Sequence, residues 1–243
     1  MSENFPPQDL ECPNPDGCTV AVGELVQRAQ AGDLPIVSFT SNRHWFRVYD
    51  ATDGYSQPNP GYGDTRFAPF DAIVDGTRVP TMYLAASLGA ALLETSFHNV
   101  HEKQKRIVSE KSLLGKLHAR VVPPQALQLV DLRDVQLAAL GLSRQNIASS
   151  ASEHYPCTRT VAQAIHASPA NPAGIIWQSR QAELNGLDGE EVAVIFADRV
   201  PYYRGAWSLG PFRDASGSLL EGAGRLLLDE LAESLEVTIS VLD

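Results

Sequence analysis

The sequence predicts an α+β fold of short strands flanked by helices. Alternation with a period of two over residues 44–49 is typical of a strand, and the apolar runs at 174–178 and 192–196 have the length of buried strands. Apolar residues at helical spacing over 19–31 and 219–235 predict two helices. Because strands and helices do not alternate regularly, we expect α+β rather than a doubly wound sheet.

The remaining elements follow from the same signals. Prolines exclude a helix from residues 1–18, which we expect to be an extended leader. Residues 50–65 are rich in Gly, Pro, Asp and Asn and predict a long loop, which is more often functional than idle. Ser87 is a helix cap, and the apolar residues after it predict a helix to about Lys105. The other expected elements are an apolar run at 36–39, strands at 81–85, 117–122, 126–132 and 237–242, and helices at 135–140 and 161–165.

Length and composition restrict the class of protein. A chain of 243 residues with 44% hydrophobic residues suits one large domain with a substantial core. No apolar stretch approaches the roughly 20 residues that span a bilayer, and the N-terminus does not resemble a secretion signal, so we expect a cytoplasmic protein without membrane contact. The formal charge of -10 argues against direct nucleic-acid binding. It leaves room for a small anionic ligand, which needs only two or three arginines.

Common catalytic motifs are missing from the sequence. It has no Gly-rich phosphate loop, no HExxH, no GxSxG and no paired CxxC. Cys12 and Cys18 flank a turn, but a second pair of ligands at metal spacing is missing, and three cysteines are too few for a disulfide framework. We therefore expect no bound metal or cofactor, and chemistry that depends on dispersed polar residues beside strands.

One stripe of polar residues lies on the helix expected after Ser87. Glu94, His98 and His101 follow Ala90 at spacings of four, four and three. A solvated helix face and a shared metal ion both fit this spacing, and the solvated face is favoured because no fourth ligand is identifiable. Glu94 differs from its neighbours because apolar residues surround it in sequence, and a carboxylate there is costly unless a partner or ligand uses it.

Two arginines are placed in the same unusual way. Arg47 lies in a strand between Phe46 and Val48, and Arg66 precedes Phe67 at the end of the long loop. Taken singly, each arginine is best explained as half of a surface ion pair. Considered with a tyrosine, the helical glutamate and a serine at a strand end, they form a set with the chain order Arg47, Arg66, Tyr83, Glu94, Ser179.

This ordered set resembles the RES domain, a family named for its arginine, glutamate and serine. The resemblance covers roughly residues 44–200, and five segments in the right order make it fairly specific. Arg66-Phe67 is followed by Ala68, at the position where RES domains usually carry an asparagine between the aromatic residue and a proline. The segments are 45–49 (WFRVY), 65–69 (TRFAP), 82–85 (MYLA), 91–94 (ALLE) and 175–180 (IIWQSR).

The resemblance implies an ADP-ribosyltransferase-like fold of mixed short-stranded sheets with flanking helices. The corresponding division is an N-terminal extension over 1–43, a RES domain over 44–204, and a C-terminal helix and strand over 205–243 that pack on the same domain. Characterised RES proteins consume NAD as toxins of toxin–antitoxin pairs, by hydrolysis or phosphorolysis. The resemblance therefore implies NAD as substrate, phosphate as an alternative co-substrate to water, a helix-turn-helix antitoxin and a homodimer.

The resemblance assigns catalytic roles to Glu94, Arg47 and Tyr83. Cleavage of the nicotinamide–ribose bond builds positive charge on the sugar, and a carboxylate stabilises that charge more in the transition state than in the ground state. Arginines can grip the pyrophosphate with forked contacts, and a tyrosine can stack on nicotinamide or hold a ribose. The residues assigned to substrate binding are Arg66, Ser179, Tyr49 and His98. All of this requires Glu94 and Arg47 to open into one shared cleft.

Two other functions stay open at this point. The enzyme can transfer ADP-ribose to a protein or nucleic acid in place of water or phosphate. In a different class, the chain can be a catalytically silent module that binds NAD or a protein, and the alanine at position 68 keeps this reading open.

Overall fold

A computed structural model shows the architecture of the chain. It describes residues 15–98, 100–104, 106–203 and 205–241. The predicted leader lies outside the described residues up to position 14, as does Cys12. Its last four residues, 15–18, are not extended as predicted but begin helix α1, because proline is tolerated in the first turn of a helix. Among the described residues, no helix is both long enough and apolar enough to cross a bilayer.

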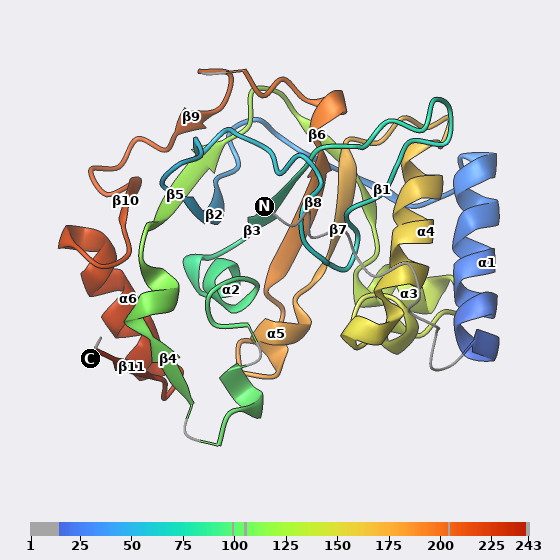
Figure 1. Ribbon diagram of the computed structural model, residues 1–243. Helices are drawn as coiled ribbons and strands as arrows, with labels where there is room; N and C mark the ends of the chain where they lie inside the picture. The colour runs from blue at the N-terminus through green and yellow to red at the C-terminus, as the bar shows by residue number, and fades with distance from the viewer. Residues whose placement is uncertain (1–14, 99, 105, 204, 242–243) are drawn as a thin grey trace.

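A curled sheet of nine strands forms the centre of the molecule (Figure 1). Its order is β1-β6-β7-β8-β3-β2-β5-β10, and β9 pairs with β5. Neighbouring strands are antiparallel, apart from the parallel pair β6 and β7. The strands are β1 Ile36–Phe39, β2 Trp45–Asp50, β3 Thr81–Ala85, β5 Lys116–Val122, β6 Leu127–Asp131, β7 Gly174–Gln178, β8 Glu191–Phe196, β9 Ser208–Leu209 and β10 Ser216–Ser218. The α+β prediction is confirmed.

The sheet opens between β2 and β3. These strands pair only through Phe46 and Ala85. On either side of the opening the pairing is complete, because all six residues of β2 pair with β5 and all five residues of β3 pair with β8. Backbone pairing therefore holds the two halves of the sheet together at one point and lets them diverge beyond it.

Helices cover the sheet in two groups (Figure 1). Helices α1 Pro15–Ala31, α3 Asp134–Ala139 and α4 Tyr155–His166 bury one face together with Trp177, Val194 and Phe196. Near the opening, α2 Leu88–Leu93 and α6 Gly222–Ser234 share a second core, to which the neighbouring α5 Arg180–Glu183 contributes Ala182. A small parallel pair, β4 Ile107–Ser109 and β11 Thr238–Ser240, borders that core.

The N-terminal helix α1 belongs to the main core. Ala21, Leu25 and Ala29 are at most 2% exposed and pack in the cluster that contains the central strands. The sulfur of Cys18 lies 2.9 Å from Nδ1 of His154, just before α4. Residues in the predicted extension thus support the same fold as the predicted domain.

The helix predicted to run from Ser87 to about Lys105 ends much earlier. Ser87 caps it as expected, accepting a hydrogen bond from Ala90 N, but α2 stops at Leu93. Thr95 turns its hydroxyl back onto the carbonyl of Ala91 at 2.7 Å, and the amide of Phe97 bonds Leu92 O. A side-chain bond to the backbone, such as that of Thr95, competes with helix continuation. The single helical stripe from Ala90 to His101 therefore does not exist. The short elements β4, α5, β9 and β10 were also not predicted.

The burial of α1 predicts the effect of truncating one of its side chains. Leu25 is fully buried, so Leu25→Ala should lower the free energy of unfolding by about 2–5 kcal/mol, because it leaves a cavity in the core. Val20 lies on the same helix and is 72% exposed, so Val20→Ala should change it by less than about 0.5 kcal/mol. Urea unfolding of both variants measures the difference. Equal stability of the two variants would show that α1 is dispensable for the core.

Candidate active site

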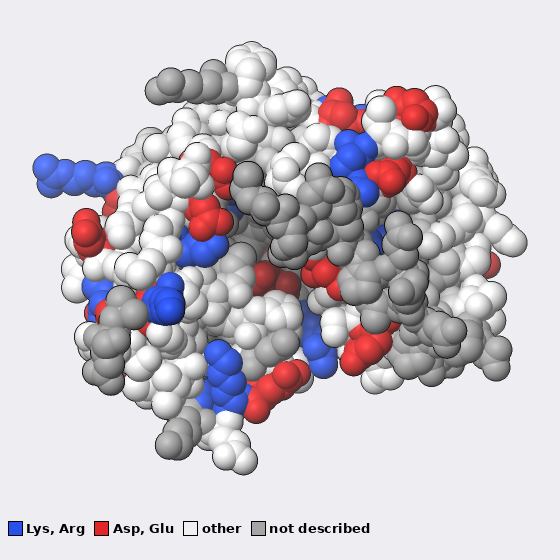
Figure 2. Space-filling view, in the orientation of Figure 1, with Lys and Arg blue, Asp and Glu red and all other residues white. Residues whose placement is uncertain are grey.

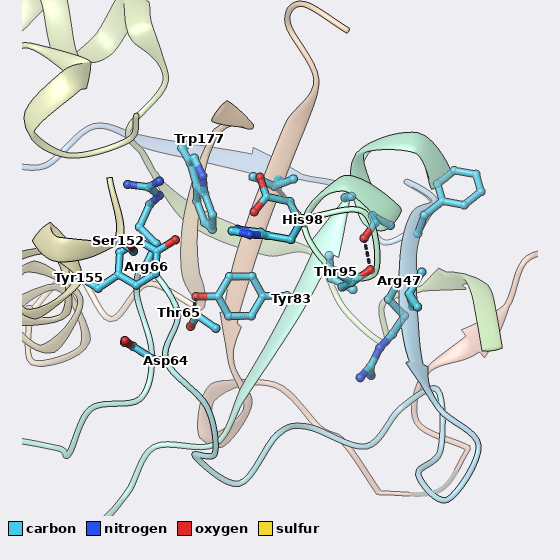
Figure 3. Close-up of a pocket in the computed structure, with 17 residues that line it drawn as sticks. Arg47, Asp64, Thr65, Arg66, Tyr83, Thr95, His98, Ser152, Tyr155 and Trp177 are labelled. Atoms are coloured by element: carbon cyan, nitrogen blue, oxygen red, sulfur yellow. Dashed lines mark hydrogen bonds between the residues drawn. The ribbon is translucent and has the colours of Figure 1, made fainter. Parts of the chain in front are cut away.

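A cavity of about 390 Å³ lies where β2 and β3 diverge (Figure 3). Both strands line it, together with the end of α2, the loop before β3 and the segment before α4. Its size falls within the range typical of small-molecule sites. On the described part of the face seen in Figure 2, acidic and basic side chains are interspersed, without a broad basic area. The lining residues are Phe46, Arg47, Val48, Asp64, Thr65, Arg66, Tyr83, Leu84, Ala85, Ala91, Glu94, Thr95, His98, Ser152, Tyr155, Trp177 and Val192.

Glu94 is the carboxylate of this cavity. It is the C-terminal cap of α2, a helix whose residues from Gly89 to Leu93 are all buried, so the backbone that carries it is firmly placed. Its Oε1 accepts a hydrogen bond of 2.6 Å from the hydroxyl of Ser179. Hydrogen bonds to a carboxylate are among the stronger ones in proteins. The early end of α2 thus places an oriented acidic group in the cavity wall.

Ser179 supports Glu94 instead of lining the cavity. It is 2% exposed and caps α5, where its Oγ accepts a hydrogen bond of 3.0 Å from Ala182 N. A hydroxyl has one proton, and here that proton points to Glu94. The sequence suggested that Ser179 contacts substrate, whereas the geometry gives it a positioning role.

Tyr83 fastens the loop before it to the cavity wall. Its hydroxyl lies 2.8 Å from Thr65 Oγ1 and accepts a bond of 3.2 Å from Phe67 N. Its ring stands edge-on to Trp177, with centroids 6.1 Å apart. Burial raises the pKa of Tyr83 well above its usual range, so the phenol stays neutral. The neutral aromatic ring of Tyr83 is therefore the part of this residue that a ligand in the cavity can contact.

The guanidinium of Arg66 is hydrogen-bonded to the segment before α4, which forms part of the cavity wall. Its guanidinium donates to Ile147 O at 2.9 Å, to Ser150 Oγ at 2.7 Å and to Ser150 O at 2.8 Å. It also lies over the ring of Tyr155, 5.3 Å from the centroid. Burial lowers its pKa, and Tyr155 and Glu94 oppose that shift. Arg66 therefore contributes positive charge near the cavity while its fork holds the 147–150 segment.

Arg47 lies on β2, across the cavity from Tyr83. Its Nη1 donates to the carbonyls of Tyr55 at 2.7 Å and Gln57 at 3.1 Å, so the guanidinium is directed toward the 55–57 segment. Its Nε is buried without a hydrogen-bond partner among the described residues. Burial lowers the pKa of Arg47 to about 10, which leaves the group charged at neutral pH. Arg47 and Glu94 line one cavity, as the sequence analysis required.

Tyr49 lies outside the cavity lining. It is 8% exposed, packs with Trp45 in the core on the other side of the sheet, and its hydroxyl lies 3.1 Å from Ser216 Oγ. Period-two alternation predicts that Tyr49 shares a face of β2 with Trp45 and Arg47, and of these three residues Arg47 alone lines the cavity. Tyr49 therefore packs in the core and contacts Ser216 without lining the cavity.

The two histidines of the predicted stripe have different surroundings. His98 lines the cavity, with its Nε2 3.3 Å from the amide nitrogen of Gln181. His101 lies beyond the end of α2 and pairs with Glu102 at 3.5 Å. Within the described part of the chain, no three His, Cys, Asp or Glu side chains are grouped so that they could hold a metal ion.

Several lining residues were not singled out from the sequence. Trp177 lies in an apolar strand and looked like core, and it does pack in the main core while also facing the cavity. Ser152 and Tyr155 lie in a stretch expected to hold only helices and turns. Asp64 and Thr65 were within the long loop, whose Gly- and Pro-rich composition was the signal that it is functional.

Comparison with known proteins agrees with this architecture. The RES domain family model matches residues 38–205. One chain from the crystal structure of the M. tuberculosis MbcT-MbcA toxin-antitoxin complex is similar in fold, with a TM-score of 0.56 and 19% sequence identity, over 86% of this chain and 97% of that chain. No curated protein sequence matches the chain. Because the family model covers more than half of its length, the chain belongs to the RES domain family.

Proposed function

We propose that this protein cleaves the nicotinamide–ribose bond of NAD and transfers the ADP-ribosyl group to water or phosphate. One observation carries the proposal: a carboxylate fixed by Ser179 opens into the same cavity as Arg47. The resemblance of the ordered set Arg47, Arg66, Tyr83, Glu94 and Ser179 to NAD-consuming RES proteins supports it.

Glu94 is the group that stabilises the transition state in this proposal. As the bond between ribose C1′ and the nicotinamide nitrogen breaks, its electron pair goes to the nicotinamide, which leaves neutral, and positive charge moves onto the ribose. The carboxylate of Glu94 favours that charge distribution over the ground state. An oxygen of water or phosphate then bonds to C1′, and water releases its extra proton to solvent. Ser179 keeps the carboxylate in place throughout.

The other cavity residues suit the rest of NAD. The edge-on rings of Tyr83 and Trp177 give an aromatic wall for a flat heterocycle. The pyrophosphate needs cationic donors, and Arg47 supplies a charged guanidinium whose Nε has no partner among the described residues. We assign Arg66 mainly to holding the wall, because Ile147 and Ser150 take its donors.

The alanine at position 68 does not weaken the enzymatic proposal. Ala68 is buried, its carbonyl accepts bonds from Thr65 N and Thr65 Oγ1, and it is outside the cavity lining. A residue there acts on the cavity through Thr65, which bonds Tyr83. Transfer of ADP-ribose to a macromolecule remains the second candidate function. Incubation with labelled NAD separates the candidates by whether the label stays on a macromolecule.

We further propose that the protein acts as the toxin of a toxin–antitoxin pair. The support is membership of the RES family and a fold shared with a chain of a toxin-antitoxin complex. The expected neutralising partner is a helix-turn-helix antitoxin, and the expected state is a cytoplasmic homodimer. Co-expression with a small helix-turn-helix protein encoded beside it tests the pairing by restored growth.

Glu94→Gln should abolish NAD cleavage while keeping the fold. The amide keeps the shape and can still accept from Ser179, but it lacks the charge, so nicotinamide release should fall by about 10²–10³ or more. Chromatography of NAD incubated with and without phosphate measures release and identifies the product. Glu233→Gln changes an exposed glutamate on α6 and is the matched control. Parental rates in Glu94→Gln would remove Glu94 from the mechanism.

Arg47→Lys should weaken NAD binding about tenfold or more, because the charge remains and the forked donors are lost. Titration of NAD in the Glu94→Gln background avoids turnover during the measurement. Arg225 lies on α6, outside the cavity lining, and bonds Asp229 on the same helix and Glu110 beyond β4, so Arg225→Lys is the control. If Arg47→Lys binds NAD as tightly as the control while unfolding at the same temperature, Arg47 does not hold the substrate.

A further inference from the structure

His98 reaches the cavity from the turn that follows α2, four residues after Glu94. Its ring is half-buried, and Figure 3 shows it directed toward the space shared by Tyr83 and Trp177. A titratable ring in this place matters for the proposed chemistry, because its charge changes the potential beside the carboxylate of Glu94.

Gln181 determines the hydrogen bonding of that ring. It lies on α5, is 4% exposed, and its amide nitrogen is 3.3 Å from Nε2 of His98. An amide NH₂ group can only donate, so Nε2 must accept, and the ring proton is then on Nδ1. An imidazolium has no acceptor nitrogen and cannot take a bond from the amide in this orientation.

The charges around His98 act in both directions. Glu94 and Glu102 favour the protonated ring, whereas Arg66 and Arg180 disfavour it. Across the cavity, Tyr83 is neutral, and burial also raises the pKa of Tyr155, so neither adds charge. Burial is the largest effect on His98, and it holds the pKa of the ring below its usual value despite the two carboxylates.

We propose that Gln181 is a positioning residue that keeps His98 as an uncharged imidazole with its proton on Nδ1, so that the ring adds no positive charge beside the reacting ribose. This inference rests on the proposed NAD cleavage. The nicotinamide ring of NAD is cationic, and its charge passes to the ribose as the bond breaks. An imidazolium beside Glu94 would repel both the bound substrate and the transition state, and would offset the stabilisation that the carboxylate provides.

The proposal predicts how cleavage depends on pH. As the pH falls through the lowered pKa of His98, the ring gains a proton, loses its bond from Gln181 and carries the opposing charge. Nicotinamide release should therefore decline only below the ordinary titration range of histidine. In His98→Gln, which cannot take up a proton, this acidic decline should be missing from the pH profile.

Gln181→Glu is the sharpest test, because it replaces the donor with a carboxylate of the same shape. A carboxylate at this distance should raise the pKa of His98 well above its usual range. The ring should then be charged at pH 7, and release of nicotinamide should fall about tenfold and recover as the pH is raised. Gln128→Glu adds the same charge on an exposed position of β6 and should leave the pH profile unchanged.

Long-range ¹H–¹⁵N NMR of the imidazole rings provides a readout that needs no NAD. His98, assigned by comparison with His98→Gln, should be the neutral Nδ1–H tautomer at pH 7 in the parent and an imidazolium in Gln181→Glu. The role of Gln181 is overturned if His98 in the parent protein is charged or carries its proton on Nε2. It is also overturned if His98 is charged in Gln181→Glu while the rate of nicotinamide release stays unchanged. If the rings behave as expected but the parent releases no nicotinamide with water or phosphate, NAD cleavage itself is wrong. If Gln181→Glu does not fold, the tautomer in the parent and the pH profile of His98→Gln still decide the question.

Discussion

The single backbone pairing between Phe46 and Ala85 is the constraint on which the site depends. Both strands are fully paired on their outer sides, so neither can move to close the gap without breaking a complete ladder. The space between them must be filled by something other than a strand. Helix α2 packs against both strands, and its last turn delivers Glu94 to the part that stays open.

Polar side chains keep that space from collapsing. Arg66, Tyr83 and Arg47 each donate or accept hydrogen bonds to a different segment of backbone, at 147–150, 65–67 and 55–57. Loops without regular pairing need such partners, because buried backbone groups are costly when unsatisfied. The arginines and the tyrosine that support the cavity are therefore the kinds of residue that a ligand like NAD requires. Because one side chain can serve both purposes, a substitution can change ligand binding and the shape of the cavity together.

The sequence identified most of the fold because the central strands have strong local signals. The apolar runs at 174–178 and 192–196 became β7 and β8, whose side chains are buried on both faces. Prediction failed where local hydrogen bonds decide the outcome: the Thr95 hydroxyl bonds Ala91 O, the Phe97 amide bonds Leu92 O, and α2 ends early. Within the site, Arg47 and Glu94 stood out as charged residues in an apolar context, and Arg66 and Tyr83 were identified through the ordered set that resembles RES domains. His98 was chosen from a helical stripe that the structure does not contain, yet it lines the cavity. Trp177 and Tyr155 were missed, because an aromatic residue that faces a cavity has the same pattern as one in a core.

Helix α5 has only four residues, yet two groups of the cavity depend on it. Ser179 at its cap orients the acid, and Gln181 in its first turn contacts the imidazole. A rigid shift of this helix would move Ser179 and Gln181 together. It would therefore change the surroundings of Glu94 and of His98 at the same time. The shortest α-helix among the described residues thus sets both the orientation of the acid and the protonation of the imidazole that follows it four residues later.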